Sequence, residues 1–223
     1  MDITKIIYPD SFFGGGDIMS QDNIILIKKR AYTIEKVLKL IFKLAIILFF
    51  TGLIVLVIIF FALPERFNAV RGNLNWHITY DFINGSSFFI DIPFKFIQPL
   101  DSNVFNAKHA VLISVISILL KESLVLYGLN QVVKILCSIS NEFPPFTMDN
   151  VERLKKLSYS IVIYSVAADI LSNVLYSIFV TKIFVLDLSD IHLSGILIGG
   201  LILVIADIFK YGVYLQNELD TKM

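Results

Sequence analysis

The sequence predicts an all-α membrane protein with four transmembrane helices, and two observations support this prediction. The twenty residues from Leu44 to Leu63 contain no charged side chain, and at ~1.5 Å of helical rise per residue they match the ~30 Å hydrocarbon core of a bilayer. Hydrophobic residues make up 56% of the chain, whereas roughly 45–50% is usual for soluble domains. Three further apolar stretches follow the first, so we expect a multi-pass protein.

The sequence divides into a tail, a basic segment, four spans and a second tail. Residues 1–22 lack the features of a cleaved secretory signal and are expected to form a flexible cytoplasmic tail. Residues 23–43 are basic and predict either an amphipathic helix near anionic headgroups or a solvated extension of the first span. The spans are expected at about 44–63, 110–133, 157–180 and 193–213, so that 44–215 forms a four-helix bundle and 216–223 a cytoplasmic tail.

The distribution of basic residues predicts the orientation. Thirteen lysines and arginines lie before the first span, between the second and third, or near the end of the fourth, and five lie in the two opposite loops. By the positive-inside rule both termini face the cytoplasm. The 19 basic and 19 acidic residues cancel, so no global charge favours nucleic acid as a direct partner, and the lipid bilayer is the expected surrounding.

The long outer loop, residues 64–106, predicts a small β-hairpin. Apolar Trp76, Ile78 and Tyr80 alternate with polar residues, Asn84-Gly85 follows, and a second alternating run ends at Pro93. Alternation on both sides of Asn-Gly is a strong local hairpin signal. We expect Trp76 and Tyr80 to lie at the membrane interface.

The inner loop between the second and third spans contains clear helix boundaries. Pro144 and Pro145 stop the helix that leaves the second span, and Thr147 or Asp149 can cap the next helix. Glu152 lies three residues after Asp149, as in a capping box.

Four ionisable residues are placed deepest in the predicted spans, namely Lys121, Glu122, Asp169 and Asp207. Counted from the cytoplasmic helix ends, Lys121 and Asp169 lie within about 5 Å in depth, so we expect an ion pair between them. Lys121 and Glu122 point ~100° apart and need partners on other helices. Asp207 is shallower and is expected to pair with Lys210 or with a basic residue of the inner loop.

These intramembrane charges fit three uses. Mutual pairing would fix how the helices align, Glu122 and Asp169 could exchange protons along a proton or cation path, or the charges could line a ligand pocket. Gly195 and Gly199 form a small-xxx-small pattern, which suits helix contact inside the molecule or dimerisation.

The sequence gives little support for metal binding, cofactor binding or enzymatic activity. The histidines His77, His109 and His192 all fall on the predicted outer face, where they could form a pH sensor or a metal site, but their spacing matches no compact metal motif. The single cysteine, Cys137, excludes an internal disulfide. The chain has none of the common zinc-protease, serine-hydrolase, phosphate-loop or Cys-x-x-Cys motifs. We therefore expect no cofactor, no metal and no enzyme.

Two stretches together resemble a known family. They are Pro145-Phe146-Thr147-Met148-Asp149-Asn150-Val151-Glu152-Arg153-Leu154, and Ala206 to Gly212 with Leu215 to Asp220. The chain resembles a bacterial family of four-helix membrane proteins known as a domain of unknown function, over roughly residues 38–221. The resemblance implies a partner, because members are often encoded beside a small helix-turn-helix regulator of the Cro/CI kind. The commoner ending continues Leu-Thr-Val, whereas here Asp220 is followed by Thr221-Lys222-Met223.

The leading hypothesis is a non-enzymatic membrane regulator or sensor of the bacterial cytoplasmic (inner) membrane. Its cytoplasmic face, 143–156 with 211–220, would dock a small DNA-binding regulator. The residues expected to contact this partner are Pro145, Phe146, Asn150, Arg153, Gly212 and Glu218. The alternatives are a small proton- or ion-coupled carrier or channel subunit and, less favoured, an intramembrane enzyme.

Overall fold

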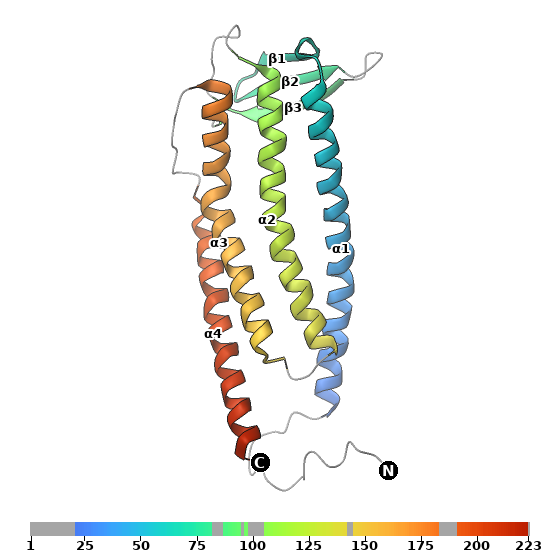
Figure 1. The fold of residues 1–223 in the computed structure, drawn as a ribbon, viewed down its shortest axis with the longest axis vertical. Helices are drawn as coiled ribbons and strands as arrows, with labels where there is room; N and C mark the ends of the chain where they lie inside the picture. Colours follow the sequence, from blue (N-terminus) through green and yellow to red (C-terminus); the bar gives the residue numbers. More distant parts are fainter. Residues whose placement is uncertain are drawn as a thin grey trace.

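Four long helices form most of the protein (Figure 1). The computed structural model describes residues 21–81, 87–94, 96–97, 105–141, 145–182 and 191–222. The helices are α1 (Gln21–Phe61), α2 (Ala107–Asn141), α3 (Met148–Tyr176) and α4 (Leu193–Lys222). All four are long and apolar enough to cross a membrane, which identifies a multi-pass membrane protein. The predicted tail, residues 1–22, lies almost wholly outside the described residues.

The two ends of the molecule differ in structure. A three-stranded sheet covers one end of the helices, which we call the sheet end. At the opposite end α1 begins and α4 finishes, and we call it the terminal end. The helix α1 has 41 residues and is about 60 Å long at the usual rise, twice the thickness of a hydrocarbon core. The basic residues 23–43 and the uncharged residues that follow them form one continuous helix. This agrees with the prediction that residues 23–43 extend the first span.

The long helices stand in an open row and not in the expected closed bundle. α1 packs on α2, α2 on α3 and α3 on α4, and within the described residues α1 and α4 share no comparable interface. The most apolar stretch of α1 is only 6% buried and that of α4 only 11%, compared with 39% for α2. The bundle prediction is wrong because lipid tails solvate apolar helix faces, so the edge helices need not close on each other.

Small residues set the close contacts between neighbouring helices. A Cβ atom added to Gly52 of α1 would lie 2.8 Å from the Leu119 side chain of α2, and one added to Gly199 would lie 2.5 Å from Val162 of α3. Gly195 approaches the Ser165 side chain of α3 even more closely. The Gly195–Gly199 pattern therefore serves a contact inside the molecule, one of the two predicted uses.

The helix α4 is displaced along α3 toward the terminal end. The His192 backbone N–H donates to the Ser165 carbonyl at 3.0 Å, so α4 begins beside Ser165, and α3 runs eleven residues further to Tyr176, or about 16 Å. A five-residue π-helix, η3 (Ser177–Thr181), prolongs α3. At the terminal end Gly212 packs on Phe146, and α4 continues to Lys222, about 15 Å beyond that contact.

The sheet contains the predicted hairpin and one additional strand. Strands β1 (Phe67–Arg71), β2 (Asn75–Asp81) and β3 (Ser87–Pro93) pair antiparallel in that order. The hairpin prediction is confirmed for β2 and β3, where Ile78 faces Ile90, and Pro93 ends β3 as expected. The Asn84-Gly85 turn lies outside the described residues. A short 3-10 helix, η2 (Pro64–Arg66), links α1 to β1.

The apolar face of the sheet packs on the helix ends. Trp76, Ile78 and Ile92 are almost completely buried, and they form one core with Ala110 of α2 and Tyr176 of α3. The Trp76 ring stacks on Phe105 with centroids 4.3 Å apart. The placement of Trp76 and Tyr80 at a lipid interface is therefore wrong, because their side chains point into the core between the sheet and the helices.

The connection between α2 and α3 is capped as predicted. The Thr147 hydroxyl accepts a hydrogen bond from the Asn150 backbone N–H at 3.2 Å, which satisfies one of the free N–H groups at the start of α3. Asp149 and Glu152 are exposed on the first turns. Pro144 lies outside the described residues.

Candidate functional site

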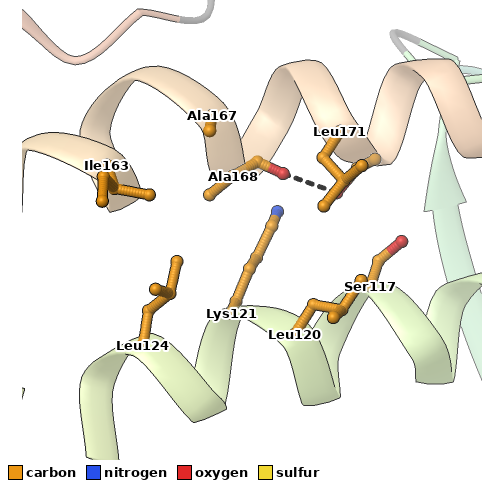
Figure 2. A pocket seen from close by; sticks show the side chains of 9 residues that line it. Ser117, Leu120, Lys121, Leu124, Ile163, Ala167, Ala168 and Leu171 are labelled. Carbon is orange, nitrogen blue, oxygen red and sulfur yellow. Dashed lines mark hydrogen bonds between the residues drawn. The ribbon is translucent and has the colours of Figure 1, made fainter. Parts of the chain in front are cut away.

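Three charged or titratable side chains meet at the start of α4, and we call them the polar centre: Lys121, Asp169 and His192. The Lys121 Nζ lies 2.5 Å from Asp169 Oδ1, and His192 Nε2 lies 3.3 Å from Asp169 Oδ2. Figure 2 shows Lys121 extending from α2 across to α3 beside Ala168. The predicted Lys121–Asp169 ion pair is therefore present, whereas the His192 contact was not foreseen.

The polar centre lies near the middle of the apolar region. Lys121 is two residues from Leu119, which contacts Gly52 in the centre of the uncharged run of α1. The Asp169 side chain is only 13% exposed and that of Lys121 26% exposed. Charges in this setting are costly unless they are paired, so the mutual contacts explain how α2 and α3 tolerate them.

A loop from the sheet end also reaches the polar centre. The Lys121 ammonium lies 5.6 Å from the centroid of the Phe96 ring, a cation–π distance. Phe96 follows β3 and packs against Tyr176 of α3. The sheet is thus connected to Lys121 through one aromatic side chain.

The other two predicted charges do not join this centre. Within the described part of the chain Glu122 makes no hydrogen bond or ion pair. Asp207 is exposed and lies 3.9 Å from Lys155, the basic partner near the inner loop that the sequence suggested. Lys155 is fourteen residues from Asp169 along α3, or about 21 Å. The prediction of one network of four charges is wrong, because Asp207 lies at another depth from the Lys121–Asp169 pair and Glu122 contacts neither of the two within the described residues.

The three histidines also lie apart. His77 of β2 contacts Asp91 of β3 with 2.5 Å between Nδ1 and Oδ1, His109 lies in the first turn of α2, and His192 belongs to the polar centre. Within the described ranges no three His, Cys, Asp or Glu side chains are grouped as metal ligands would be. A shared histidine site is therefore not formed.

The first motif of the resemblance forms a hydrogen-bond network between α2 and α3 at the terminal end, which we call the Asn150 network. Asn150 is fully buried, and its side-chain amide donates to the Pro145 carbonyl at 3.0 Å and to the Ser138 hydroxyl at 3.2 Å. Its Oδ1 accepts from Arg153 Nη1 at 3.0 Å, and Arg153 also donates to the Lys134 carbonyl. These bonds fasten the start of α3 to the end of α2.

The same segment is fastened to α4 by an aromatic contact. The Phe146 ring lies 5.0 Å from the Phe209 ring and covers Gly212, where a Cβ would meet Phe146 at 2.9 Å. The docking role expected for Asn150 is therefore wrong, because its buried side chain cannot contact a partner. The Phe146 ring already packs against Gly212. Phe146 and Glu218 keep exposed surface, and Glu218 pairs with Lys222 at 2.7 Å.

Glu35 of α1 is a buried polar residue whose role was not predicted from the sequence. It is 5% exposed, accepts from Lys39 Nζ at 2.5 Å and accepts from the Ser140 hydroxyl of α2 at 2.6 Å. These hydrogen bonds, first from Lys39 and then from Ser140, lower the pKa of the Glu35 carboxyl. The four-residue spacing from Lys39 was a readable signal, but the Ser140 contact depends on how α1 packs on α2.

The comparisons with known proteins identify a family only. Neither the curated proteins nor the solved structures contain a match to this chain. Residues 96–221 match the family described as "Protein of unknown function (DUF2975)". This match starts after β3, whereas the resemblance was expected to start near residue 38. It includes α2, α3, most of α4, the polar centre and the Asn150 network. Since the match covers more than half of the sequence, the chain belongs to the DUF2975 family of proteins of unknown function.

Proposed function

We propose that this protein is a non-enzymatic membrane regulator or sensor that docks a cytoplasmic partner at its terminal end. The positive-inside distribution of lysine and arginine supports a cytoplasmic terminal end, in the cytoplasmic membrane of a bacterium. The resemblance suggests a small helix-turn-helix transcriptional regulator as the partner. No enzymatic step is part of the proposal.

The observation that carries this proposal is an apolar stripe on the last turns of α4. Tyr211, Tyr214, Leu215 and Leu219 are 63%, 65%, 41% and 54% exposed, and their spacing places them on one face of the helix. We call these four residues the C-terminal stripe. It extends past the start of α3, where no described element packs on it.

The surroundings of the C-terminal stripe favour protein over lipid as its contact. Lys155 and Lys156 lie near the start of α3, a position typical of the headgroup level, and the stripe continues beyond it. The Glu218–Lys222 ion pair lies on the same part of α4, as does exposed Asn217. An exposed helix end with large apolar side chains commonly binds a groove on a partner protein, and burial of each side chain would contribute up to about 1.5–3 kcal/mol.

The helix α4 can also connect the polar centre with the docking surface. His192 directly precedes α4 and contacts Asp169 of α3, while the C-terminal stripe lies at the other end of the same continuous helix. A change in the His192–Asp169 contact would shift α4 along α3, where Gly195 and Gly199 form the interface. This arrangement supports a sensor in which an event in the membrane alters partner binding.

The proposal is tested by placing charge on the C-terminal stripe. In Leu215→Glu/Leu219→Glu the stripe loses its apolar face, and recovery of a co-expressed helix-turn-helix regulator of the Cro/CI kind with the detergent-solubilised protein should fall at least tenfold. Asn217→Glu adds one negative charge, half of that in the double variant, on the side of α4 opposite Leu215 and Leu219, and it should leave recovery unchanged. In a deletion strain, transcript levels controlled by the regulator should be restored by Asn217→Glu and not by the double variant.

Two results would contradict the regulator proposal. One is that no helix-turn-helix regulator is recovered with the wild-type protein. The other is that deletion of the chain leaves the transcripts unchanged.

One observation favours the second candidate, a small ion- or proton-coupled carrier. Glu122 lies beside Lys121 in the membrane region and has no ion pair within the described residues. If it carries protons, Glu122→Gln should abolish a proton flux in proteoliposomes while the protein keeps its helical content and its elution volume. An unchanged flux, or no flux in the wild type, would reject the carrier.

A further inference from the structure

A cavity of about 160 Å³ lies between β3, α2 and α3 on the sheet side of the polar centre. The apolar part of its wall comes from β3 and from Phe96 and Ile118. The polar part of the wall is formed by six residues, namely Asp91, Ser114, Ser117, Lys121, Ser172 and Tyr176.

Ser117 is the residue that indicates an occupant. It is 6% exposed, and its Oγ has no hydrogen-bond partner in the part of the chain that the structure describes. It lines this cavity and also a neighbouring one of about 100 Å³, shown in Figure 2. Ser117 and Lys121 are one helical turn apart and both extend from α2 toward α3 (Figure 2). A buried hydroxyl without a partner costs about 1–3 kcal/mol, and a rotation of the Ser117 side chain that turns its hydroxyl to an occupant of the cavity would remove this cost.

The hydrogen bonds around the cavity define what the occupant must offer. The Ser114 hydroxyl donates its only hydrogen to the Ala110 carbonyl, so Tyr176 must be the donor in the 2.6 Å bond between Tyr176 and Ser114. The Ser172 hydroxyl donates to the Ala168 carbonyl. The oxygens of Tyr176 and Ser172 can therefore only accept further bonds, whereas Lys121 can only donate. An occupant must both donate and accept.

Each charged side chain in the cavity wall already has a partner, which favours an uncharged occupant. Lys121 pairs with Asp169, and Asp91 at the β3 wall contacts His77. A lipid acyl chain would leave the Ser117 hydroxyl without a partner. Water both donates and accepts, and at ~30 Å³ per molecule about five would fill the larger cavity.

We propose that this cavity is a hydrated vestibule, open to the aqueous phase at the sheet end, in which water binds Ser117 and Lys121. The polar centre is then in contact with outside water although it lies near the middle of the apolar run. This inference does not depend on the proposed regulator function, because it concerns the opposite end of the molecule and needs no partner.

Thiol accessibility tests the vestibule. Ser117→Cys is made in a Cys137→Ser background, so that the introduced thiol is the only one. The matched control is Ile54→Cys, because Ile54 is 62% exposed on α1 and, like Ser117, lies two residues toward the sheet end from the Gly52–Leu119 contact. Hydrophilic thiol reagents react with the thiolate, which forms in water and not among acyl chains.

We expect a membrane-impermeant methanethiosulfonate to modify Ser117→Cys in intact cells at least tenfold faster than Ile54→Cys. Full labelling of both variants in SDS shows that both thiols are present, and equal elution volumes in detergent show that both fold. Equal rates in cells would overturn the proposal, because a dry or lipid-filled cavity shields Ser117 as lipid shields Ile54. Reaction of Ser117→Cys only in inverted vesicles would overturn the proposed contact of the cavity with outside water.

Discussion

At the residue scale, the polar centre shows how few side chains hold two membrane helices in place. Lys121 and Asp169 each lie on a different helix, and their contact joins α2 to α3 at one depth. His192 extends the same contact to the start of α4. Since one carboxylate serves both partners, a change at Asp169 affects three helices at once.

Removal of one partner of the ion pair should destabilise the fold more than removal of both. Asp169→Asn leaves Lys121 uncompensated and should cost about 1–3 kcal/mol, because both side chains are partly screened by their remaining exposure. Lys121→Met/Asp169→Leu removes both charges and should recover most of that loss. Thermal unfolding in detergent measures both, and a double variant less stable than Asp169→Asn would show that the pair itself stabilises the protein.

Glu35 gives a pH dependence with a defined sign. Its pKa is lowered in the folded protein from the ordinary value of 4.5, so the charged form stabilises the fold above that value, and the contribution is lost as the pH falls through the lowered pKa. Glu35→Gln should reduce stability by about 1–2 kcal/mol at neutral pH, where hydrogen bonds to a charged acceptor are lost. The difference in stability between wild type and variant should shrink as the pH falls below 4.5, and melting temperatures measure it. A difference that stays constant with pH would contradict this role.

At the element scale, small residues decide how closely α4 approaches α3. Gly199 faces Val162 and the Ser158 carbonyl, whereas the next residue, Gly200, has open space where its Cβ would lie. The Ser158 hydroxyl donates to the Gly199 carbonyl at 2.7 Å, a bond between helices that requires this short distance. The two adjacent glycines therefore provide a test with its own control.

Gly199→Ala should separate α3 from α4, and Gly200→Ala should not. The new Cβ of Gly199→Ala would lie 2.5 Å from Val162, so the helices must shift at a cost of about 1–3 kcal/mol. Gly200→Ala meets nothing and should be neutral or stabilising by up to about 1 kcal/mol, because alanine favours the helix. Melting temperatures of the two variants measure the difference, and equal values would contradict the close packing seen at Gly199.

At the scale of the whole molecule, the open row leaves both edge helices facing their surroundings. Apolar edge helices suit a protein in lipid, since acyl chains cover them as well as another helix would. The same row leaves the ends of α1 and α4 as separate extensions at the terminal end (Figure 1). A partner can therefore contact α4 there without displacing any described element.

Cysteine cross-linking can distinguish the row from a closed bundle. In a Cys137→Ser background, Gly52→Cys/Leu119→Cys joins α1 to α2, which are in contact, and a short thiol cross-linker should connect them within one chain. Leu44→Cys/Ile198→Cys pairs exposed positions of α1 and α4 and should give no such product. Efficient cross-linking of the second pair within one chain would indicate that the helices close into a bundle.

The sequence by itself determined the features that depend on local pattern or on distance along one helix. Twenty uncharged residues are enough to predict the first span, alternation around Asn84-Gly85 predicted the hairpin of β2 and β3, and Thr147 was readable as a helix cap. The Lys121–Asp169 pair was predictable because α2 ends and α3 begins at the same end of the molecule, so that counting residues from that end gives depth.

Only the tertiary structure decided which helix faces meet. It placed α4 beside Ser165, which brought His192 to Asp169, left Glu122 outside the polar centre and kept the helices in a row. It also buried Asn150 in the hydrogen-bond network between α2 and α3, although Asn150 was expected to contact a partner. Periodicity and length fix an element and its depth, whereas rotation and sliding of one helix on another depend on side-chain packing between residues far apart in the chain, which no local pattern contains.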